Sequence, residues 1–443
     1  SSERHRSVPL RIGVLVDLHW REDAGGHVKC WERFALAATK FPSSLDMTVH
    51  FLGAESKTVP LADNVRYRIH EPVFSTARMP FLSHVPDHTD LALFHPGLAQ
   101  GLPGYDILHT TNAHFAFART AERVAARCAI PLVNSVHTNI PAYNRVFTEM
   151  TVRRLFGDGF IARAMLERAR VDRQAEAHAH RVLAAHQEKC AHVLVTRARE
   201  RRRVRRVMPD DRIGLLHRGV DKALFHPAHR DRAWLERTFG IPQDRVLVFY
   251  AGRVDPGKNV MTLAEAVASL VERGVPVHLL CAGNGDQRTA VLGRLGNNAT
   301  CPGAVATETV AKMHACADVF AFPSELDELG NVVQEALSSG VPVLLPRRYE
   351  ILTPIRDGES GWFVPGRSPR AWADALETLT GNPRRLRTMG KAARVLAERM
   401  LPSWEDVLAR DLLPVWLAAG VESGRYIEPL KLKENADDRR IAA

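Results

Sequence analysis

Short apolar runs alternate with amphipathic stretches along most of the chain. The short runs favour buried strands, and the stretches between them have the spacing of helices. This alternation is typical of parallel sheets that are covered by helices on both faces. The predicted strands are residues 11–16, 47–52, 106–109, 132–136, 193–196 and 213–216 in the first half, and 246–251, 277–282, 319–322, 341–345 and 362–364 in the second.

The predicted elements form two series, so we expect an α/β protein with two Rossmann-like domains. A chain of 443 residues is also longer than the ~250–300 residues that one hydrophobic core usually supports. The second series begins at Val246. We assign residues 1–225 to the first domain and residues 226–402 to the second, with the exact boundary taken from the resemblance described below. A helical pattern follows at 403–421, and residues 422–443 form a polar tail.

An acidic loop lies between a predicted strand and a predicted helix of the second domain. The strand ends near Phe322, two acids follow at Asp327 and Glu335, and the helix begins near Gly330. Ligands of parallel sheets bind at the carboxyl ends of the strands, and a helix start attracts phosphate. Carboxylates in this position suit the hydroxyls of a ribose or a sugar. An acidic surface loop before an ordinary core helix would give the same pattern.

A second loop of this domain carries two cations. The apolar strand that starts at Val246 runs into Gly252 and Arg253, and Lys258 precedes another predicted helix. The planar fork of arginine and the point charge of lysine both suit phosphate. Fixed cations also stabilise the charge that develops on a departing diphosphate. A solvated charged turn is the alternative interpretation.

Both loops resemble signatures of the retaining glycosyltransferases of family 4, which have the GT-B fold with two Rossmann-like domains facing each other across a cleft. The acidic loop is similar to the E-x7-E signature, with Asp327 where the family more often has Glu. Residues 250–259 are similar to Y-x-G-R-x-x-x-x-K-N, and residues 218–227 to the R-G-V-D-x-x-x-F-x-P link between the domains. The resemblance also implies that residues 403–421 return to the first domain.

The resemblance implies a nucleotide-sugar donor on the second domain, a UDP-hexose rather than GDP-mannose. No metal and no other cofactor is expected, because no Asp-x-Asp element appears and the two cations already supply positive charge. The implied contacts are Arg253 and Lys258 with the diphosphate, Glu335 with the ribose, Asp327 with the sugar hydroxyls, and the helix start at Gly330, Asn331 and Val332 with phosphate and sugar.

Two segments of the first domain also match the family. Gly25 and Gly26 match its glycine-rich first loop, where glycine lets the backbone approach a phosphate or a sugar. The segment Ser135–Tyr143 is similar to S-x-H-T-[DNH]-x-P-x-Y in members that build glycolipids and related mannosyl conjugates. This similarity implies that His137 donates a hydrogen bond to the donor sugar or to the acceptor. A histidine that is packed at the end of a strand is the alternative.

The implied function is a retaining, metal-independent hexosyltransferase that acts on a hydroxyl of a lipid, a glycan or a small molecule. In such enzymes the departing diphosphate oxygen takes the proton of the acceptor. Residues 346–350 stand where the family often has a Gly-Gly pair before an acid, so the identity of the donor sugar stays open. The base of the nucleotide (UDP or GDP), the acceptor, the linkage and the oligomeric state also stay open. A GT-B epimerase or phosphorylase is an alternative. A dinucleotide oxidoreductase is disfavoured, since no G-x-G-x-x-G follows the first strand.

The amino-acid composition indicates the cellular compartment of the protein. Hydrophobic residues make up 45% and charged residues 25% of the chain, as in ordinary globular proteins. The six cysteines lack metal-ligand or disulfide spacing and indicate reduced, mostly buried thiols. No apolar run approaches the ~20 residues of a membrane span, and the first residues contain no apolar segment of a signal peptide. We therefore expect a cytoplasmic protein.

Positive charge is concentrated in the first domain. The net charge is +10, the pI is about 9.5, and residues 197–206 are rich in arginine. Peripheral contact with the anionic inner face of a membrane is one interpretation, a solvated helix face is another, and a nucleic-acid-binding protein is a rival function. Phe147, Leu155, Phe156, Phe160 and Ile161 could enter lipid or belong to the core, whereas His178, His180 and His186 are expected at the surface.

Overall fold

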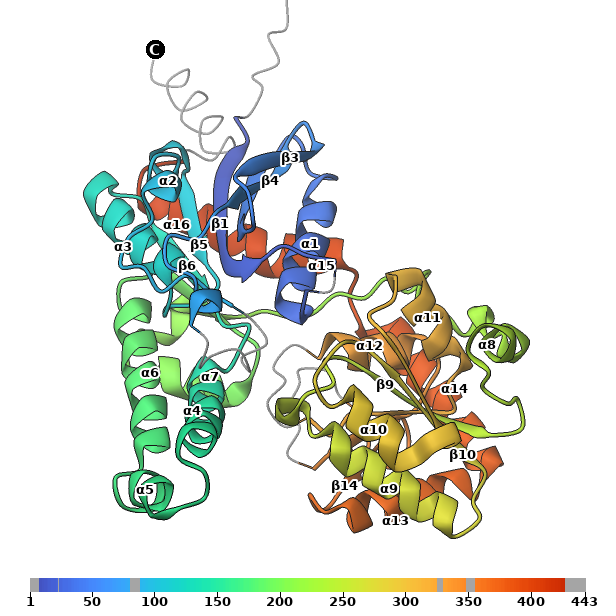
Figure 1. Cartoon of the computed structure of the whole chain (residues 1–443). Helices are drawn as coiled ribbons and strands as arrows, with labels where there is room; N and C mark the ends of the chain where they lie inside the picture. The colour runs from blue at the N-terminus through green and yellow to red at the C-terminus, as the bar shows by residue number, and fades with distance from the viewer. Residues whose placement is uncertain (1–7, 23, 80–87, 325–329, 348–354, 427–443) are drawn as a thin grey trace, which may run out of the picture. The chain divides into compact units, whose positions relative to one another are not determined.

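The computed structural model describes residues 8–22, 24–79, 88–324, 330–347 and 355–426. The chain divides into two compact units, one formed by Ser1–His217 with Trp404–Ala443 and the other by Arg218–Ser403. The division after residue 217 lies somewhat before the one expected from the sequence, after residue 225. Each unit is an α/β structure built on its own sheet (Figure 1).

In the described residues of the first unit, eight strands form one sheet in the order β3-β4-β2-β1-β5-β6-β7-β8. β3 runs antiparallel to β4, and the other neighbouring pairs are parallel, with Ile12 opposite both Met47 and Ile107. The strands are β1 Leu10–His19, β2 Leu45–Leu52, β3 Lys57–Ala62, β4 Val65–His70, β5 Ile107–Thr110, β6 Leu132–Ser135, β7 His192–Val195 and β8 Ile213–Leu215.

Helices cover both faces of this sheet. Successive side chains of a strand point to opposite faces, and Val14 packs in a core cluster with Trp31 and Trp416 while Leu15 packs in another with Phe117. The helices are α1 Gly26–Ala38, α2 Pro96–Ala99, α3 Ala116–Cys128, α4 Ile140–Phe156, α5 Phe160–Arg163, α6 Val171–Gln187, α7 Ala198–Val204, α15 Trp404–Val407 and α16 Leu413–Glu422, with π-helical turns at Ala164–Arg168 and Leu408–Leu412 and 3₁₀ turns at Thr76–Arg78, Leu102–Gly104 and Asp210–Arg212.

In the second unit, the described residues form a parallel sheet of six strands in the order β11-β10-β9-β12-β13-β14. This is the doubly wound order in which ligands bind where the strand order reverses, here between β9 and β12. The strands are β9 Val246–Ala251, β10 Val277–Ala282, β11 Ala299–Gly303, β12 Val319–Ala321, β13 Val343–Pro346 and β14 Gly361–Val364.

The helices of the second unit bury the sheet in one continuous apolar core. They are α8 Arg232–Phe239, α9 Val260–Glu272, α10 Arg288–Leu295, α11 Thr307–Cys316, α12 Asn331–Ser338, α13 Pro369–Thr380 and α14 Pro383–Met400, with 3₁₀ turns at Pro227–His229, Pro256–Lys258 and Gly296–Asn298. The predicted fold class of two parallel-sheet α/β domains is confirmed. β3, β4 and β11 were not predicted from the sequence.

Candidate active site

The loop after β9 is held in place by backbone contacts with the loop after β10. Gly252 has φ +145°, and Gly283 has φ +142°. A Cβ atom on Gly283 would lie 2.0 Å from the Gly252 carbonyl oxygen. The Val254 N–H donates to the Asn284 carbonyl at 2.9 Å. Both glycines have conformations that other residues rarely adopt. Because Arg253 directly follows Gly252, this packing fixes the point at which Arg253 leaves the end of β9.

Arg253 and Lys258 both lie on this loop, as the sequence predicted. Arg253 Nε is 3.0 Å from Asp255 Oδ2, and both side chains are largely buried. Asp255 Oδ1 is buried and has no hydrogen-bond partner among the residues that the structure describes. Lys258 Nζ lies 5.8 Å from the ring centroid of Phe322, at the end of β12. The two cations therefore lie near the point where the strand order reverses.

The loops after β9 and β12 also contact each other directly. Asn259 has φ +56°, and its Nδ2 donates to the Pro323 carbonyl at 3.4 Å. The next residue, Ser324, is fully buried, and its Oγ has no hydrogen-bond partner within the described part of the chain. A buried polar atom without a partner is costly in a protein interior, so this end of the sheet contains groups that suit a polar ligand.

The start of α12 has the arrangement that the sequence predicted. Gly330, with φ +65°, precedes the helix, and Asn331 and Val332 form its first turn, where the backbone N–H groups have no acceptor in their own helix. Glu335 lies one turn further, with a side chain only 13% exposed. Asp327 lies outside the described residues, so its contact with a sugar stays a prediction.

His314 of α11 lies beneath Glu335. Its Nε2 is 3.7 Å from Glu335 Oε2, and its ring packs against Phe249 and Phe320. Burial lowers the pKa of His314, while the neighbouring Glu335 carboxylate acts in the opposite direction. A neutral histidine under the carboxylate leaves Glu335 as an acceptor for hydroxyl groups.

In the first unit, the predicted Gly25 and Gly26 begin α1. Gly25 has an ordinary φ of −66°, and a Cβ atom there would meet no atom within 4 Å. Backbone strain and protein packing therefore do not require glycine at this position. Open space beside the loop fits the predicted approach of a ligand, which remains untested.

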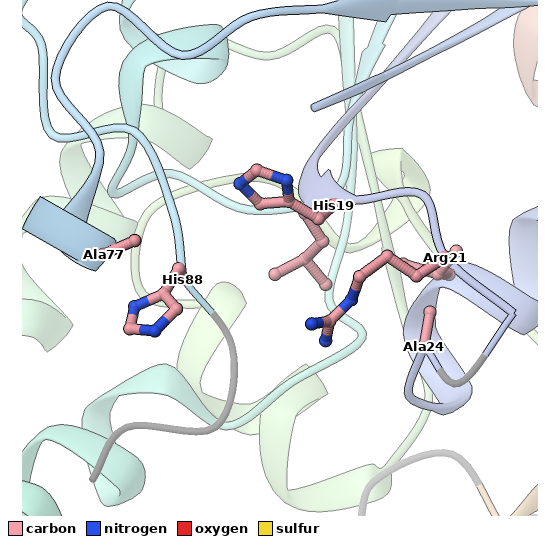
Figure 2. Close-up of a pocket in the computed structure, with 7 residues that line it drawn as sticks. His19, Arg21, Ala24, Ala77 and His88 are labelled. Carbon is pink, nitrogen blue, oxygen red and sulfur yellow. The ribbon is translucent and has the colours of Figure 1, made fainter. Parts of the chain in front are cut away.

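A pocket of about 120 Å³ lies beside this glycine loop. Figure 2 shows the Arg21 guanidinium and the rings of His19 and His88 around it. Burial, Arg21 and His88 lower the pKa of His19, and its Nε2 is buried with no hydrogen-bond partner in the ranges that are described. The other residues that line the pocket are Leu18, Ala24, Val28 and Ala77. This pocket was not predicted from the sequence because its histidines and arginine follow no motif.

His137 follows β6 and is only 1% exposed. Its Nε2 lies 2.6 Å from Ser135 Oγ and accepts from Trp31 Nε1 at 3.3 Å. The ring of His27 stacks on it with centroids 4.7 Å apart. The structure therefore places His137 at a strand end, packed against α1, and its predicted contact with a substrate remains a prediction.

The predictions for the burial of other histidines, the cysteines and the arginine-rich segment have different outcomes. His186 is buried, 2.7 Å from Thr110 Oγ1 and 2.5 Å from Glu122 Oε1, so its expected surface position was wrong, while His178 is exposed. Five of the described cysteines are buried, as expected. In the arginine-rich segment Arg197 is buried, whereas Arg202, Arg203, Arg205 and Arg206 are exposed.

Two features are absent from the residues that the structure describes. None of their helices has the length and apolar character of a membrane span. No group of three or more His, Cys, Asp and Glu side chains among them is arranged to hold a metal ion.

Comparisons with known proteins agree with this geometry. The family model for glycosyl transferases group 1 matches residues 231–396, which contain the candidate donor site. A D-inositol 3-phosphate glycosyltransferase of Thermomonospora curvata is 30% identical over 339 residues, 72% of this chain and 72% of that protein. One from Nocardioides sp. is 29% identical over 348 residues, 73% and 69% of the two chains.

Solved structures agree on the fold. Sucrose-phosphate synthase from Thermosynechococcus elongatus has a TM-score of 0.63 at 19% identity and covers 97% of this chain and 100% of its own. Anabaena Alr3699/HepE in complex with UDP-glucose has a TM-score of 0.64 at 15% identity, covering 93% and 100%. The chain belongs to the group 1 glycosyltransferases, family 4, which have the GT-B fold.

Proposed function

We propose that this glycosyltransferase is a retaining, metal-independent hexosyltransferase whose second unit binds a UDP-hexose. The observation that carries the proposal is the gathering of Arg253, Lys258 and Glu335 around the carboxyl ends of β9 and β12. Support for UDP comes from a structural neighbour, Anabaena HepE, which was solved with UDP-glucose.

Each of these side chains has a distinct role in the proposal. Asp255 holds the Arg253 guanidinium at the end of the strand, where an arginine, with its five N–H donors, suits a diphosphate. Lys258 adds a second positive charge. The Glu335 carboxylate accepts hydrogen bonds from the two ribose hydroxyls, and Asp327 accepts from the hydroxyls of the sugar.

The reaction needs no carboxylate base. As the bond between the sugar C1 and the diphosphate oxygen breaks, the acceptor oxygen bonds to C1 on the same face. The departing diphosphate oxygen takes the acceptor's proton, and configuration is retained. Arg253 and Lys258 stabilise the negative charge on the leaving group, which is where fixed cations lower the barrier most.

The proposed acceptor is a hydroxyl of a polyol that carries a phosphate. The pocket beside Gly25 combines Arg21 with His19 and His88, which together suit an anionic group. The relatives from Thermomonospora curvata and Nocardioides sp. are named for inositol 3-phosphate. A polyol that carries a phosphate occurs both as a free small molecule and as the headgroup of a lipid.

The end of the helical pair α4 and α6 favours presentation on a membrane. α4 and α6 lie side by side, with α5 at their far end (Figure 1). Phe160 is 73% exposed, and its apolar neighbours are also exposed, so the core interpretation was wrong for these residues, whereas Phe147 is partly buried. The exposed apolar side chains are Leu155, Phe156, Phe160 and Ile161, and the exposed arginines around them are Arg153, Arg154, Arg163, Arg168 and Arg170.

Exposed apolar side chains with arginines near them, as at this end of the α4 and α6 pair, suit the interface of an anionic bilayer. Each basic residue near such a surface contributes roughly 1 kcal/mol, although Arg153 is paired with Glu149 and Asp158. We therefore place the protein in the cytoplasm, in peripheral contact with the inner face of the membrane.

Calorimetric titration with UDP, UDP-hexoses, GDP and GDP-mannose tests the donor. UDP and one UDP-hexose are expected to bind, and Glu335→Gln is expected to weaken both because the ribose is common to them. Thermal unfolding gives an independent readout, since a ligand at about 100 times its Kd stabilises by about 2.7 kcal/mol. Tighter binding of GDP-mannose than of any UDP-sugar would contradict the proposed donor.

Transfer assays with inositol 3-phosphate and with vesicles of phosphatidylinositol distinguish the two sources of acceptor. Arg21→Ala is expected to raise the acceptor KM and to leave the Kd of UDP unchanged.

In flotation assays with anionic vesicles, the double variant Phe160→Ser with Ile161→Ser is expected to lose binding to the vesicles. Val395→Ser, which changes an exposed apolar residue of α14, is the matched control. Equal flotation of both variants would contradict membrane contact.

A further inference from the structure

A buried row of hydrogen-bonding side chains connects the C-terminal helix α16 with His137. Trp416 Nε1 donates to His109 Nδ1 at 2.8 Å. His109 Nε2 lies 2.7 Å from Ser135 Oγ, which lies 2.6 Å from His137 Nε2. All four side chains are at most 1% exposed. The row runs along the face of the first unit's sheet that α1 and α16 cover, from α16 over β5 to the end of β6.

The direction of the first link is fixed by chemistry. An indole N–H can only donate, so His109 Nδ1 must accept. Burial lowers the pKa of His109 to about 3, so the ring is neutral near pH 7 and carries one hydrogen. That hydrogen must be on Nε2, because Nδ1 is the acceptor.

The second link follows from the first, since His109 Nε2–H must donate to Ser135 Oγ. A hydroxyl oxygen can accept two hydrogen bonds, so this link alone does not fix the direction between Ser135 and His137.

Trp31 fixes the direction of the last link. Its indole Nε1 donates to His137 Nε2 at 3.3 Å, and this N–H also can only donate. His137 Nε2 therefore carries no hydrogen, and the Ser135 hydroxyl must donate to it as well. The hydrogen of the neutral His137 ring must then be on Nδ1.

We infer that Trp416, His109 and Ser135 are positioning residues that hold His137 as its Nδ1–H tautomer, so that this ring acts on substrate as a hydrogen-bond donor and not as a base. In this form the one lone pair of the ring is already used at Nε2. The inference rests on the proposed function for the part that His137 has in transfer. It gives that function a residue that donates to a sugar or acceptor oxygen while the diphosphate takes the proton.

The tautomer can be measured in the full chain without any substrate. A long-range ¹H–¹⁵N spectrum of protein with ¹⁵N-labelled histidine rings distinguishes protonated from unprotonated ring nitrogens, and His137→Gln identifies the relevant signals by their loss. The expected result is a protonated Nδ1 and an unprotonated Nε2 at neutral pH. A hydrogen on Nε2 would overturn the inference.

A matched pair of variants tests the positioning role. Trp416→Phe removes the indole N–H that donates to His109. Trp404→Phe removes a buried indole N–H that has no hydrogen-bond partner among the described residues. In Trp416→Phe the hydrogen of His109 is expected to be no longer confined to Nε2, and in Trp404→Phe the spectrum of His109 is expected to stay as in the wild type. The same spectrum of His109 in both variants would overturn the role of Trp416.

Turnover gives the second readout. Trp416→Phe and Ser135→Ala are each expected to lower kcat about tenfold, the effect of one hydrogen bond of ordinary strength, with an unchanged Kd for UDP. Ser135→Ala also keeps the test valid if Trp416→Phe does not fold. Wild-type kcat in Ser135→Ala would overturn the role of the row in transfer. If the wild type turns over no nucleotide sugar, the proposed function fails, while the ring spectrum still decides the tautomer.

Discussion

The contact between Gly283 and Gly252 gives the sharpest structural prediction, because it links the fold to the proposed diphosphate site. In Gly283→Ala the new Cβ atom would lie 2.0 Å from the Gly252 carbonyl oxygen. Both partners are backbone, so no flexible side chain can yield. The φ of +142° adds strain of about 1–3 kcal/mol for a residue with a side chain, and overpacking adds about 1–3 kcal/mol more.

Gly240→Ala is the matched control. Gly240 also has a positive φ, +70°, but a Cβ atom there would meet nothing within 4 Å. Its substitution introduces only the left-handed strain, about 1–2 kcal/mol. The steric contact should therefore make Gly283→Ala less stable than Gly240→Ala by about 1–3 kcal/mol, or about 2–12 °C in Tm for a unit of this size.

Binding should separate the two variants further. The clash displaces Gly252, which is followed directly by Arg253, and a shift of about 1 Å at a binding group can reduce activity on the order of 100-fold. Calorimetric titration with UDP is expected to show at least about tenfold weaker binding for Gly283→Ala than for Gly240→Ala. Equal Tm values and equal UDP affinities in the two variants would refute the reasoning that backbone packing positions Arg253.

Three further predictions address charged groups. Arg253→Ala and Lys258→Ala are each expected to lower kcat by raising the activation barrier by about 3–4 kcal/mol. Near-normal turnover in both variants would contradict the assignment of these two residues to the diphosphate. Glu335→Gln should weaken free UDP as well as the whole donor, whereas Asp327→Asn should spare UDP and impair transfer; equal losses of UDP affinity would contradict this division. Burial raises the pKa of Asp17 to about 7, above the ~3.9 of an unfolded chain, so the native state binds the extra proton and the free energy of unfolding should fall as pH rises from 4 to 7. Denaturant titrations at both ends of this range should show a smaller fall for Asp17→Asn, and an equal fall would show that Asp17 does not titrate in this way.

Most of the strands that the sequence predicted have side chains buried on both faces. β9 and β10 are continuous apolar runs, because helices cover both sides of a parallel sheet. β3 was missed because it is an edge strand that contains Pro60, and β11 because Thr300 and Pro302 interrupt its apolar character. Edge strands need less apolar sequence, so their pattern is weak.

The positions of the residues in the candidate donor site could be predicted because these residues follow individual strands at short spacing. Arg253 lies directly after β9, and Gly330 and Glu335 flank the start of α12. The row from Trp416 to His137 could not be predicted, since it joins residues that are 307 positions apart. His186 was misjudged for a related reason, because Thr110 and Glu122, which bury its ring, lie on other elements.

The anomeric configuration of the first product decides whether transfer is retaining. The protein is incubated with an α-linked UDP-hexose in the presence of EDTA, and proton NMR follows the anomeric signal of the sugar that is transferred to an acceptor or, slowly, to water. We expect an α-configured first product and activity that survives chelation, since Arg253 and Lys258 supply the positive charge at the leaving group. A β-configured first product, or complete loss of activity in EDTA that Mn²⁺ restores, would contradict this expectation.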